Sequence, residues 1–333
     1  MGAASDCPRP QFEALLTSLI GGLFSEGRMP PGAVIDAGAY KGQWACFYAQ
    51  QDRARPVIAL DPDLWLVHHM KRAYGRTHAN LQPRHGALGE TSSSRTLSRA
   101  ESRQEGMSLY PASGKKEWYE EHQNGSFSFP TLTIDALFEN TTLAFASLDL
   151  EGHELQALKG GNRTLVRDQP VFTTEVVVHY NPAKTQELLT YVDRLGYDSF
   201  LIEEICGMRA DTRNVLHIPR SRGASFMGSH ALDMAVASKV LFAVSAQSIL
   251  NFAFPCCARG RECCPDQWCC PHWRVQMYLN RVIMSGGDDI RRFTRTSWYD
   301  EKWHVWGPHR AAHTRKQVAE ALATNLSRIG FYY

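Results

Sequence analysis

The 333-residue sequence has no excess of charge of either sign, with 36 lysines and arginines against 34 aspartates and glutamates and a formal net charge of +2. Proteins that bind nucleic acid or anionic membranes usually carry a basic surface, so this balance is not typical of either class. The 44% hydrophobic content is that of an ordinary globular protein. We therefore expect a small-molecule ligand and no nucleic acid.

Segments that address a protein to a membrane are also lacking. The N-terminal residues show no basic stretch followed by an apolar core, so no signal peptide is visible and a cytoplasmic location is favoured. The longest apolar stretch, residues 240–254, is interrupted by four polar residues. A membrane span needs about 20 apolar residues. This stretch predicts a buried helix instead, and we expect no transmembrane segment.

What is present is an alternation of short apolar runs with amphipathic stretches. The runs predict seven strands, at residues 33–35, 57–60, 81–88, 144–150, 171–178, 198–202 and 214–218. Between them the spacing predicts helices at residues 43–50, 64–74, 154–166 and 185–195. This order is typical of an α/β, Rossmann-like fold, a mostly parallel seven-stranded sheet with helices on both faces.

The same pattern divides the chain into three parts. Residues 1–30 hold a lead-in helix at 12–24, residues 31–220 hold the α/β domain, and residues 221–333 form a cysteine-rich, partly helical extension with a helix expected at 314–329. A polar insert at about residues 90–130 interrupts the domain, and its first part, 91–106, is predicted to be a surface loop or a flexible segment.

A glycine-bearing turn lies between the first strand and the next helix, in the run VIDAGAYKGQ at residues 34–43. Glycines at such a turn let the backbone bend sharply and let a ligand approach it. A dinucleotide site needs a third, middle glycine for the pyrophosphate. Tyr40 stands at that place. The turn therefore favours a nucleoside without a diphosphate, such as S-adenosylmethionine, over a dinucleotide.

Two further strand ends carry acidic residues. Asp61 ends the second strand, where a carboxylate can accept hydrogen bonds from both ribose hydroxyls, or alternatively cap the next helix. Asp149, Glu151 and His153 follow a later strand, at the edge where ligands of open α/β sheets bind. The alternative for Asp149 or Glu151 is also a helix cap.

Taken together, these runs resemble the FkbM family of methyltransferases over residues 33–219. The likeness is carried by VIDAGAYKGQW, VIALDPD, HGALGE, TLTIDALFE and, most specifically, SLDLEGHELQALKGG. The resemblance implies a class I methyltransferase fold, S-adenosylmethionine as the methyl donor, and methylation of a hydroxyl oxygen on a small molecule or glycan. For donor binding it implies Asp36, Gly38, Ala39, Gly42, Asp61, Ala87, Leu88 and Asp149. Asp61 departs from the frequent glutamate, which gives a shorter reach.

A hydroxyl acceptor must lose a proton as it attacks the donor methyl group. His153 is the first candidate for the base, because imidazole titrates near neutral pH. Glu151 and Asp149 are the next candidates, and Glu175 is a further one. Two other classes stay open, a nucleotide-dependent oxidoreductase and a non-catalytic binding protein on the same fold.

The nine cysteines fall into two groups. Cys7, Cys46 and Cys206 are scattered and are predicted to be reduced thiols, whereas six lie in adjacent pairs between Cys256 and Cys270. Zinc sites usually space their cysteines further apart. Metal binding, disulfides and free or lipidated thiols therefore all stay open for the second group, and no metal ligand is assigned.

Overall fold

The computed structural model describes residues 7, 14–98, 126–177, 182–202, 212–237 and 241–249. Expectations for Cys206, for the segment from Cys256 to Cys270, for most of the polar insert and for the helix at 314–329 lie outside these ranges.

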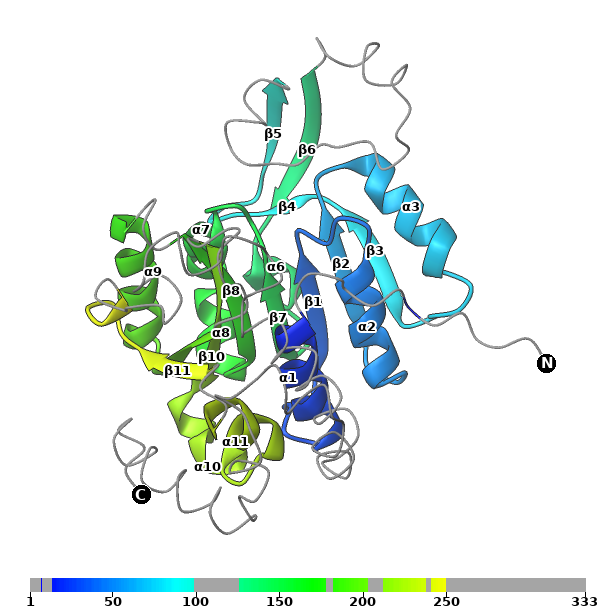
Figure 1. Cartoon of the computed structure of the whole chain (residues 1–333). Helices are drawn as coiled ribbons and strands as arrows, with labels where there is room; N and C mark the ends of the chain where they lie inside the picture. Colours follow the sequence, from blue (N-terminus) through cyan, green and yellow to red (C-terminus); the bar gives the residue numbers. More distant parts are fainter. Residues whose placement is uncertain are drawn as a thin grey trace, which may run out of the picture.

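An eight-stranded sheet forms the centre of the molecule (Figure 1), in the order β11-β9-β10-β8-β7-β1-β2-β3. The strands are β1 (Ala33–Ala37), β2 (Val57–Asp61), β3 (Leu81–His85), β7 (Leu143–Leu148), β8 (Val171–Val177), β9 (Tyr197–Ile202), β10 (Thr212–Pro219) and β11 (Leu241–Val244). Neighbours from β3 to β8 pair in parallel, whereas β10 and β11 run antiparallel to the strands beside them. The mostly parallel sheet and six of the seven expected strands are confirmed, whereas the strand expected at residues 81–88 is divided into β3 and β4 (Ala87–Leu88), and only β3 belongs to this sheet.

The eighth strand corrects one expectation. Residues 240–254 were predicted to be a buried helix, but Leu241 to Val244 form β11. This segment pairs with the edge of β9, in the register Leu241↔Ile202 to Val244↔Ser199. An open strand edge offers unpaired backbone groups, and pairing with them decides the conformation of a short apolar run that fits helix or strand equally well.

Helices cover both faces of the sheet. The helices α1 (Ala14–Ser25), α2 (Gln43–Gln51), α3 (Leu64–Tyr74) and α11 (His230–Ala237) contribute to one apolar cluster. The helices α6 (Ile134–Leu137), α7 (Glu154–Lys159), α8 (Asn162–Asp168) and α9 (Pro182–Arg194) contribute to the other. Val34 belongs to the first cluster and Ile35 to the second, as the alternation of side chains along a strand requires. A short turn, η1 (Arg220–Arg222), and α10 (Gly223–Phe226) precede α11.

The single helix expected at residues 154–166 is two helices, because the helical conformation is interrupted at Gly160 and Gly161. A side chain at Gly160 would collide with the carbonyl oxygen of Gly89, and one at Gly161 would lie 2.9 Å from Ile134 Cβ. The glycine pair lets this part of the chain pack closely against Gly89 and Ile134.

A second sheet of three strands lies beyond the first, in the order β4-β6-β5. Its strands are β4 (Ala87–Leu88), β5 (Ser93–Ser98) and β6 (Ser126–Leu132), and Figure 1 shows β5 and β6 projecting past the end of the main sheet. The surface loop expected at 91–106 is therefore wrong for residues 93–98. Ser93 to Ser98 have little apolar character, and their strand conformation comes from antiparallel pairing with β6.

A disulfide joins Cys7 to Cys46. The expectation that these two cysteines are reduced thiols is therefore wrong. They are 39 residues apart in the sequence, so spacing alone could not pair them. Within the ranges that the structure describes, no helix combines the length and the apolar character that crossing a bilayer requires.

Candidate active site

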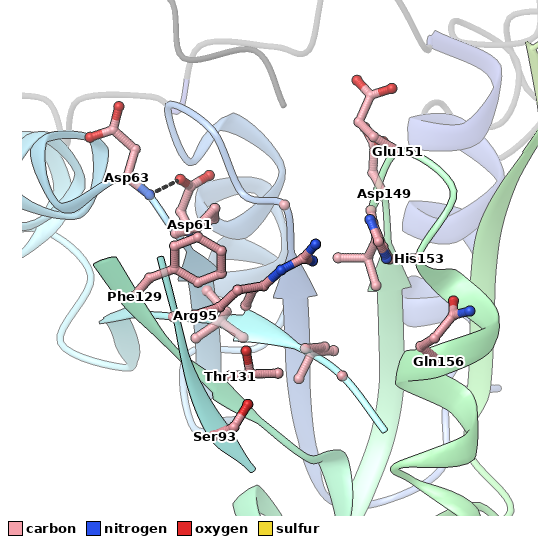
Figure 2. A pocket seen from close by; sticks show the side chains of 18 of the residues that line it. Asp61, Asp63, Ser93, Arg95, Phe129, Thr131, Asp149, Glu151, His153 and Gln156 are labelled. Carbon is pink, nitrogen blue, oxygen red and sulfur yellow. Dashed lines mark hydrogen bonds between the residues drawn. The ribbon is translucent and has the colours of Figure 1, made fainter. Parts of the chain in front are cut away.

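A cavity of about 500 Å³ opens at the carboxyl ends of β1, β2 and β7. The sheet order reverses there, since β1 continues to β2 on one side and β7 lies on the other. This is the place where open α/β sheets bind ligands. Seven of the residues expected at the site line the cavity: Gly38, Asp61, Ala87, Leu88, Asp149, Glu151 and His153. Figure 2 shows Asp61 on one side of it and Asp149, Glu151 and His153 on the other.

The loops after β1 and β7 are fastened to each other by their backbones. Asp149 N–H donates to the carbonyl oxygen of Ala37 at 3.1 Å. Gly38 has a φ of +82°, and a side chain on it would collide with the carbonyl oxygen of Asp149. Gly38 is therefore required by the contact between the two loops, as well as by any ligand that approaches the turn.

Asp61 holds the glycine-bearing turn from the neighbouring strand. Its Oδ2 accepts from Tyr40 N–H at 2.8 Å, and its Oδ1 accepts from Asp63 N–H at 2.8 Å. Asp63, and not Asp61, caps α3 by accepting from Trp65 N–H. A carboxylate has about four acceptor positions, so each Asp61 oxygen retains capacity for a ligand hydroxyl.

The Asp61 side chain is only 5% exposed. Burial raises the pKa of its carboxyl to about 7, although hydrogen bonds from the two backbone N–H groups oppose the shift. Burial without a compensating charge disfavours the ionised form. A bound cation or hydroxyl donors would favour ionisation.

Three other residues expected to bind the donor are not among the lining residues. Asp36 is buried within β1, and neither Asp36, Ala39 nor Gly42 lines the cavity. Gly42 is the N-cap of α2, with a φ of +76°, and a side chain there would lie 2.7 Å from the Met70 side chain. Gly42 thus serves the packing of α2 against α3. Tyr40 does line the cavity, at the place of the missing middle glycine.

Glu154, which is not among the site residues expected from the sequence, holds the turn after β7. Glu154 is 3% exposed, and its Oε1 accepts from Leu150 N–H at 2.9 Å and from Gly152 N–H at 3.2 Å. Burial raises the pKa of this carboxyl. These bonds hold a tight turn in which Glu151 and Gly152 have φ values of +52° and +94°. In the sequence, the only sign of this role is that Glu154 is an acidic residue two positions after Gly152.

His153 stands at the N-cap of α7, so neither Asp149 nor Glu151 occupies the cap position. The three side chains follow one strand end and line one cavity. Glu175, the further candidate for the base, lies on β8 and is not among the lining residues.

One face of β5 and β6 forms the opposite wall of the cavity. Ser93 and Arg95 of β5 pair across with Thr131 and Phe129 of β6, and all four line the cavity. On the other face, Thr96 and Ser128 share a hydrogen bond of 2.7 Å between their hydroxyls. Figure 2 shows the Arg95 side chain reaching from the Asp61 side toward Asp149 and His153. No sequence motif marked these residues.

The cavity is strongly acidic. Its lining includes the carboxylates of Asp61, Asp63, Glu90, Asp149 and Glu151. Among the lining residues that the structure describes, Arg95 is the one guanidinium and no lysine occurs. Such a wall attracts cations, whereas a diphosphate would be repelled.

A comparison with protein families agrees with this geometry. The model of the methyltransferase FkbM domain matches residues 36–199. Residues 36–199 are an FkbM methyltransferase domain. Its matched range runs from β1 into β9 and includes the whole cavity. Domains of this family depend on S-adenosylmethionine, so the methyl donor follows from the family.

Solved structures that resemble the FkbM domain are distant. A crystal structure of methyltransferase FkbM from Methylobacillus flagellatus is 18% identical with a TM-score of 0.40, and the match covers 56% of this chain and 43% of that one. Fibrillarin from Aeropyrum pernix with bound S-adenosyl-L-methionine is 10% identical with a TM-score of 0.37, covering 62% and 76%. The tRNA methyltransferase TrmK from B. subtilis is 12% identical with a TM-score of 0.35, covering 97% and 98%. Curated protein sequences gave no match. The fold assignment rests on the strand order.

Proposed function

We propose that this protein transfers the methyl group of S-adenosylmethionine to a hydroxyl oxygen of a small molecule or glycan. The observation that supports this most is the joint lining of one acidic cavity by Asp61 and by the segment Asp149 to His153. The Asp61 carboxylate suits the hydroxyls of a ribose, and the segment Asp149 to His153 suits a reacting centre. A cavity of about 500 Å³ is within the range of small-molecule sites.

In donor binding, Asp61 would accept hydrogen bonds from both ribose hydroxyls. Ala87 and Leu88 of β4 would lie along the adenine. Asp149 would lie near the methionine end, where its charge complements a sulfonium or an ammonium group. The backbone contact between Gly38 and Asp149 would keep these two parts of the donor site in fixed register.

Methyl transfer from a sulfonium is an in-line displacement by the acceptor oxygen. The donor is already activated, so the main task of the protein is to align that oxygen behind the methyl carbon. In our proposal His153 removes the hydroxyl proton as the oxygen–carbon bond forms and the carbon–sulfur bond breaks. Glu151 and Asp149 are alternative bases on the same turn. Glu154 is a positioning residue, because it holds that turn through Leu150 and Gly152.

Calorimetric titration of the purified full chain with S-adenosylmethionine, S-adenosylhomocysteine and a nicotinamide dinucleotide tests the donor. We expect both sulfur nucleosides to bind and the dinucleotide not to bind. Incubation with methyl-labelled donor and a mixture of hydroxyl compounds then tests transfer by mass shift. Donor binding without transfer to any acceptor would favour a non-catalytic binding protein, and a folded chain that ignores both sulfur nucleosides would refute the proposal.

A further inference from the structure

Cys7, Cys46 and His78 form a cluster outside the cavity. Cys7 precedes α1, Cys46 lies in α2, and His78 lies in the turn between α3 and β3. Their exposed fractions are 9%, 0% and 3%, and their ligand atoms lie within 4.8 Å of one another. None of the three lines the cavity. The methyltransfer chemistry therefore gives no reason for this arrangement.

The hydroxyl of Thr77 is the hydrogen-bond partner of one ring nitrogen of His78. Thr77 Oγ1 can donate its only hydrogen to the carbonyl oxygen of Tyr74, at 3.2 Å. The same hydroxyl lies 2.8 Å from His78 Nδ1, and when it donates to Tyr74 it accepts from Nδ1–H. In that tautomer of the neutral ring, Nε2 carries the lone pair.

Both sulfurs lie close to the imidazole ring. His78 Nε2 lies 3.6 Å from Cys7 Sγ and 3.9 Å from Cys46 Sγ, and Nδ1 is also 3.9 Å from Cys46 Sγ. A disulfide has no hydrogen to donate to Nε2. Buried polar atoms normally have a partner, and leaving one without a partner is unfavourable. With the proton on Nδ1, the disulfide gives Nε2 no hydrogen-bond donor, whereas a cation between the three atoms would accept its lone pair.

Zinc fits the distances that are already present. Tetrahedral zinc has Zn–S and Zn–N bonds of about 2.3 and 2.0–2.1 Å, which places sulfur and nitrogen about 3.6 Å apart. The two sulfur-to-Nε2 distances are close to this value. Only the two sulfurs would have to separate. The hydrogen bond from Nδ1 to Thr77 is the outer contact that orients zinc-binding histidines.

We propose that the reduced protein binds one zinc ion through Cys7 Sγ, Cys46 Sγ and His78 Nε2, with water as the fourth ligand. The disulfide is the metal-free, oxidised form of the same site. Reduction by a water-soluble phosphine breaks the sulfur–sulfur bond, the two sulfurs gain the two hydrogens of a water molecule, and phosphorus gains its oxygen. Zinc then displaces the two thiol protons. Either form ties Cys7 to α2, the helix that Gly42 caps.

The test uses the full-length chain in which the six cysteines from Cys256 to Cys270 are serine, since these are separate candidate ligands. Thiols are counted before and after anaerobic reduction with a phosphine, and a gain of two is expected. Zinc is then added, excess is removed, and bound metal is measured by mass spectrometry. Cobalt substitution gives a second measurement, the sulfur-to-cobalt charge-transfer absorption. We expect one equivalent of metal.

Substitutions separate this site from incidental binding. His78→Gln and Cys46→Ser should each lower zinc affinity more than a hundredfold. Thr77→Val should lower it about 10- to 100-fold, since it removes only the outer hydrogen bond. His69→Gln, which changes a histidine of α3 that stacks on Trp65, is the matched control and should have no effect. The proposal is overturned by a reduced protein without metal, by metal content that His78→Gln leaves unchanged, or by a disulfide that resists reduction in the folded chain.

Discussion

The cavity is enclosed by two walls that are built in different ways. The donor wall consists of the loops after β1, β2 and β7, which backbone contacts hold together, such as Asp149 N–H to Ala37 and Tyr40 N–H to Asp61. The ribbon wall is one face of β5 and β6, and it offers the side chains of Ser93, Arg95, Phe129 and Thr131.

The two walls therefore differ in how far their residues also stabilise the fold. On the donor wall, a changed residue disturbs the sheet and the ligand site together, because Gly38, Asp61 and Glu154 each bond to or touch backbone. On the ribbon wall, the lining side chains project from a three-stranded sheet that joins the main sheet through no strand pairing among the described residues. We infer that the donor wall serves the shared methyl donor and the ribbon wall serves the acceptor.

Gly38→Ala should give the largest effect and break the donor wall. A side chain at a φ of +82° costs about 1–2 kcal/mol, and the collision with the Asp149 carbonyl adds to it, for a total of roughly 3 kcal/mol or more. Urea unfolding measures the loss. Gly196→Ala is the matched control, since Gly196 has a φ of +87° but no atom within 4 Å of the added carbon. Equal losses at both positions would show that the contact between the two loops contributes nothing.

His153→Ala tests the reacting end of the donor wall. Removal of a general base typically costs 10²–10⁴-fold, so we expect kcat to fall at least about a hundredfold. The Kd for S-adenosylmethionine should stay within about twofold, since His153 is not assigned to donor binding. Single-turnover rates measure the first quantity and calorimetry the second. An unchanged rate would move the base to Glu151 or Asp149.

These two residues belong to the part of the site that could be predicted from the sequence. Gly38 and His153 stand in short motifs at strand ends, where a strand-to-helix pattern already implies a ligand edge. The seven strands followed from local apolar runs, which is why the main sheet was predictable. The sequence did not indicate that Gly38 contacts Asp149 or that Cys7 bonds to Cys46, since both depend on contacts between distant segments. The ribbon was missed because Ser93 to Ser98 are nearly all polar, and only pairing with β6 makes them a strand.

Asp61→Asn should weaken donor binding with a smaller loss. The asparagine amide keeps one carbonyl oxygen as an acceptor, but its NH2 group cannot accept from the second backbone N–H. Hydrogen bonds to a charged group contribute about 1.5–3 kcal/mol. We therefore expect the Kd for S-adenosylmethionine to rise about 10- to 100-fold in calorimetry. Asp135→Asn is the control, because Asp135 likewise accepts from two backbone N–H groups, at Thr164 and Arg163, but lies outside the cavity. A similar rise in both variants would count against the ribose role.

Donor binding should also depend on pH through the same carboxyl. The pKa of Asp61 is raised from 3.8 to about 7 in the folded protein, so its proton stabilises the fold below pH 3.8, and this stabilisation is lost as pH rises toward 7. Binding of a cationic donor favours the ionised form. The Kd should therefore rise as pH falls below about 7, by at most tenfold per unit, and this dependence should disappear in Asp61→Asn. A flat profile in the unmodified protein would contradict the assignment.

The smallest effect should come from the ribbon wall, and it decides whether the two walls have separate tasks. Arg95→Ala removes a guanidinium that can donate to acceptor oxygens, so the KM for an acceptor found in the labelled-donor screen should rise about tenfold. Donor Kd and unfolding free energy should hardly change, because Arg95 belongs to β5 of the ribbon wall and not to the loops of the donor wall. Thr96→Ala, next to it on the opposite face of β5, should leave the acceptor KM unchanged. If Arg95→Ala instead weakens S-adenosylmethionine binding and spares the acceptor, the ribbon belongs to the donor site, and acceptor recognition must come from the turn at Asp149 to His153.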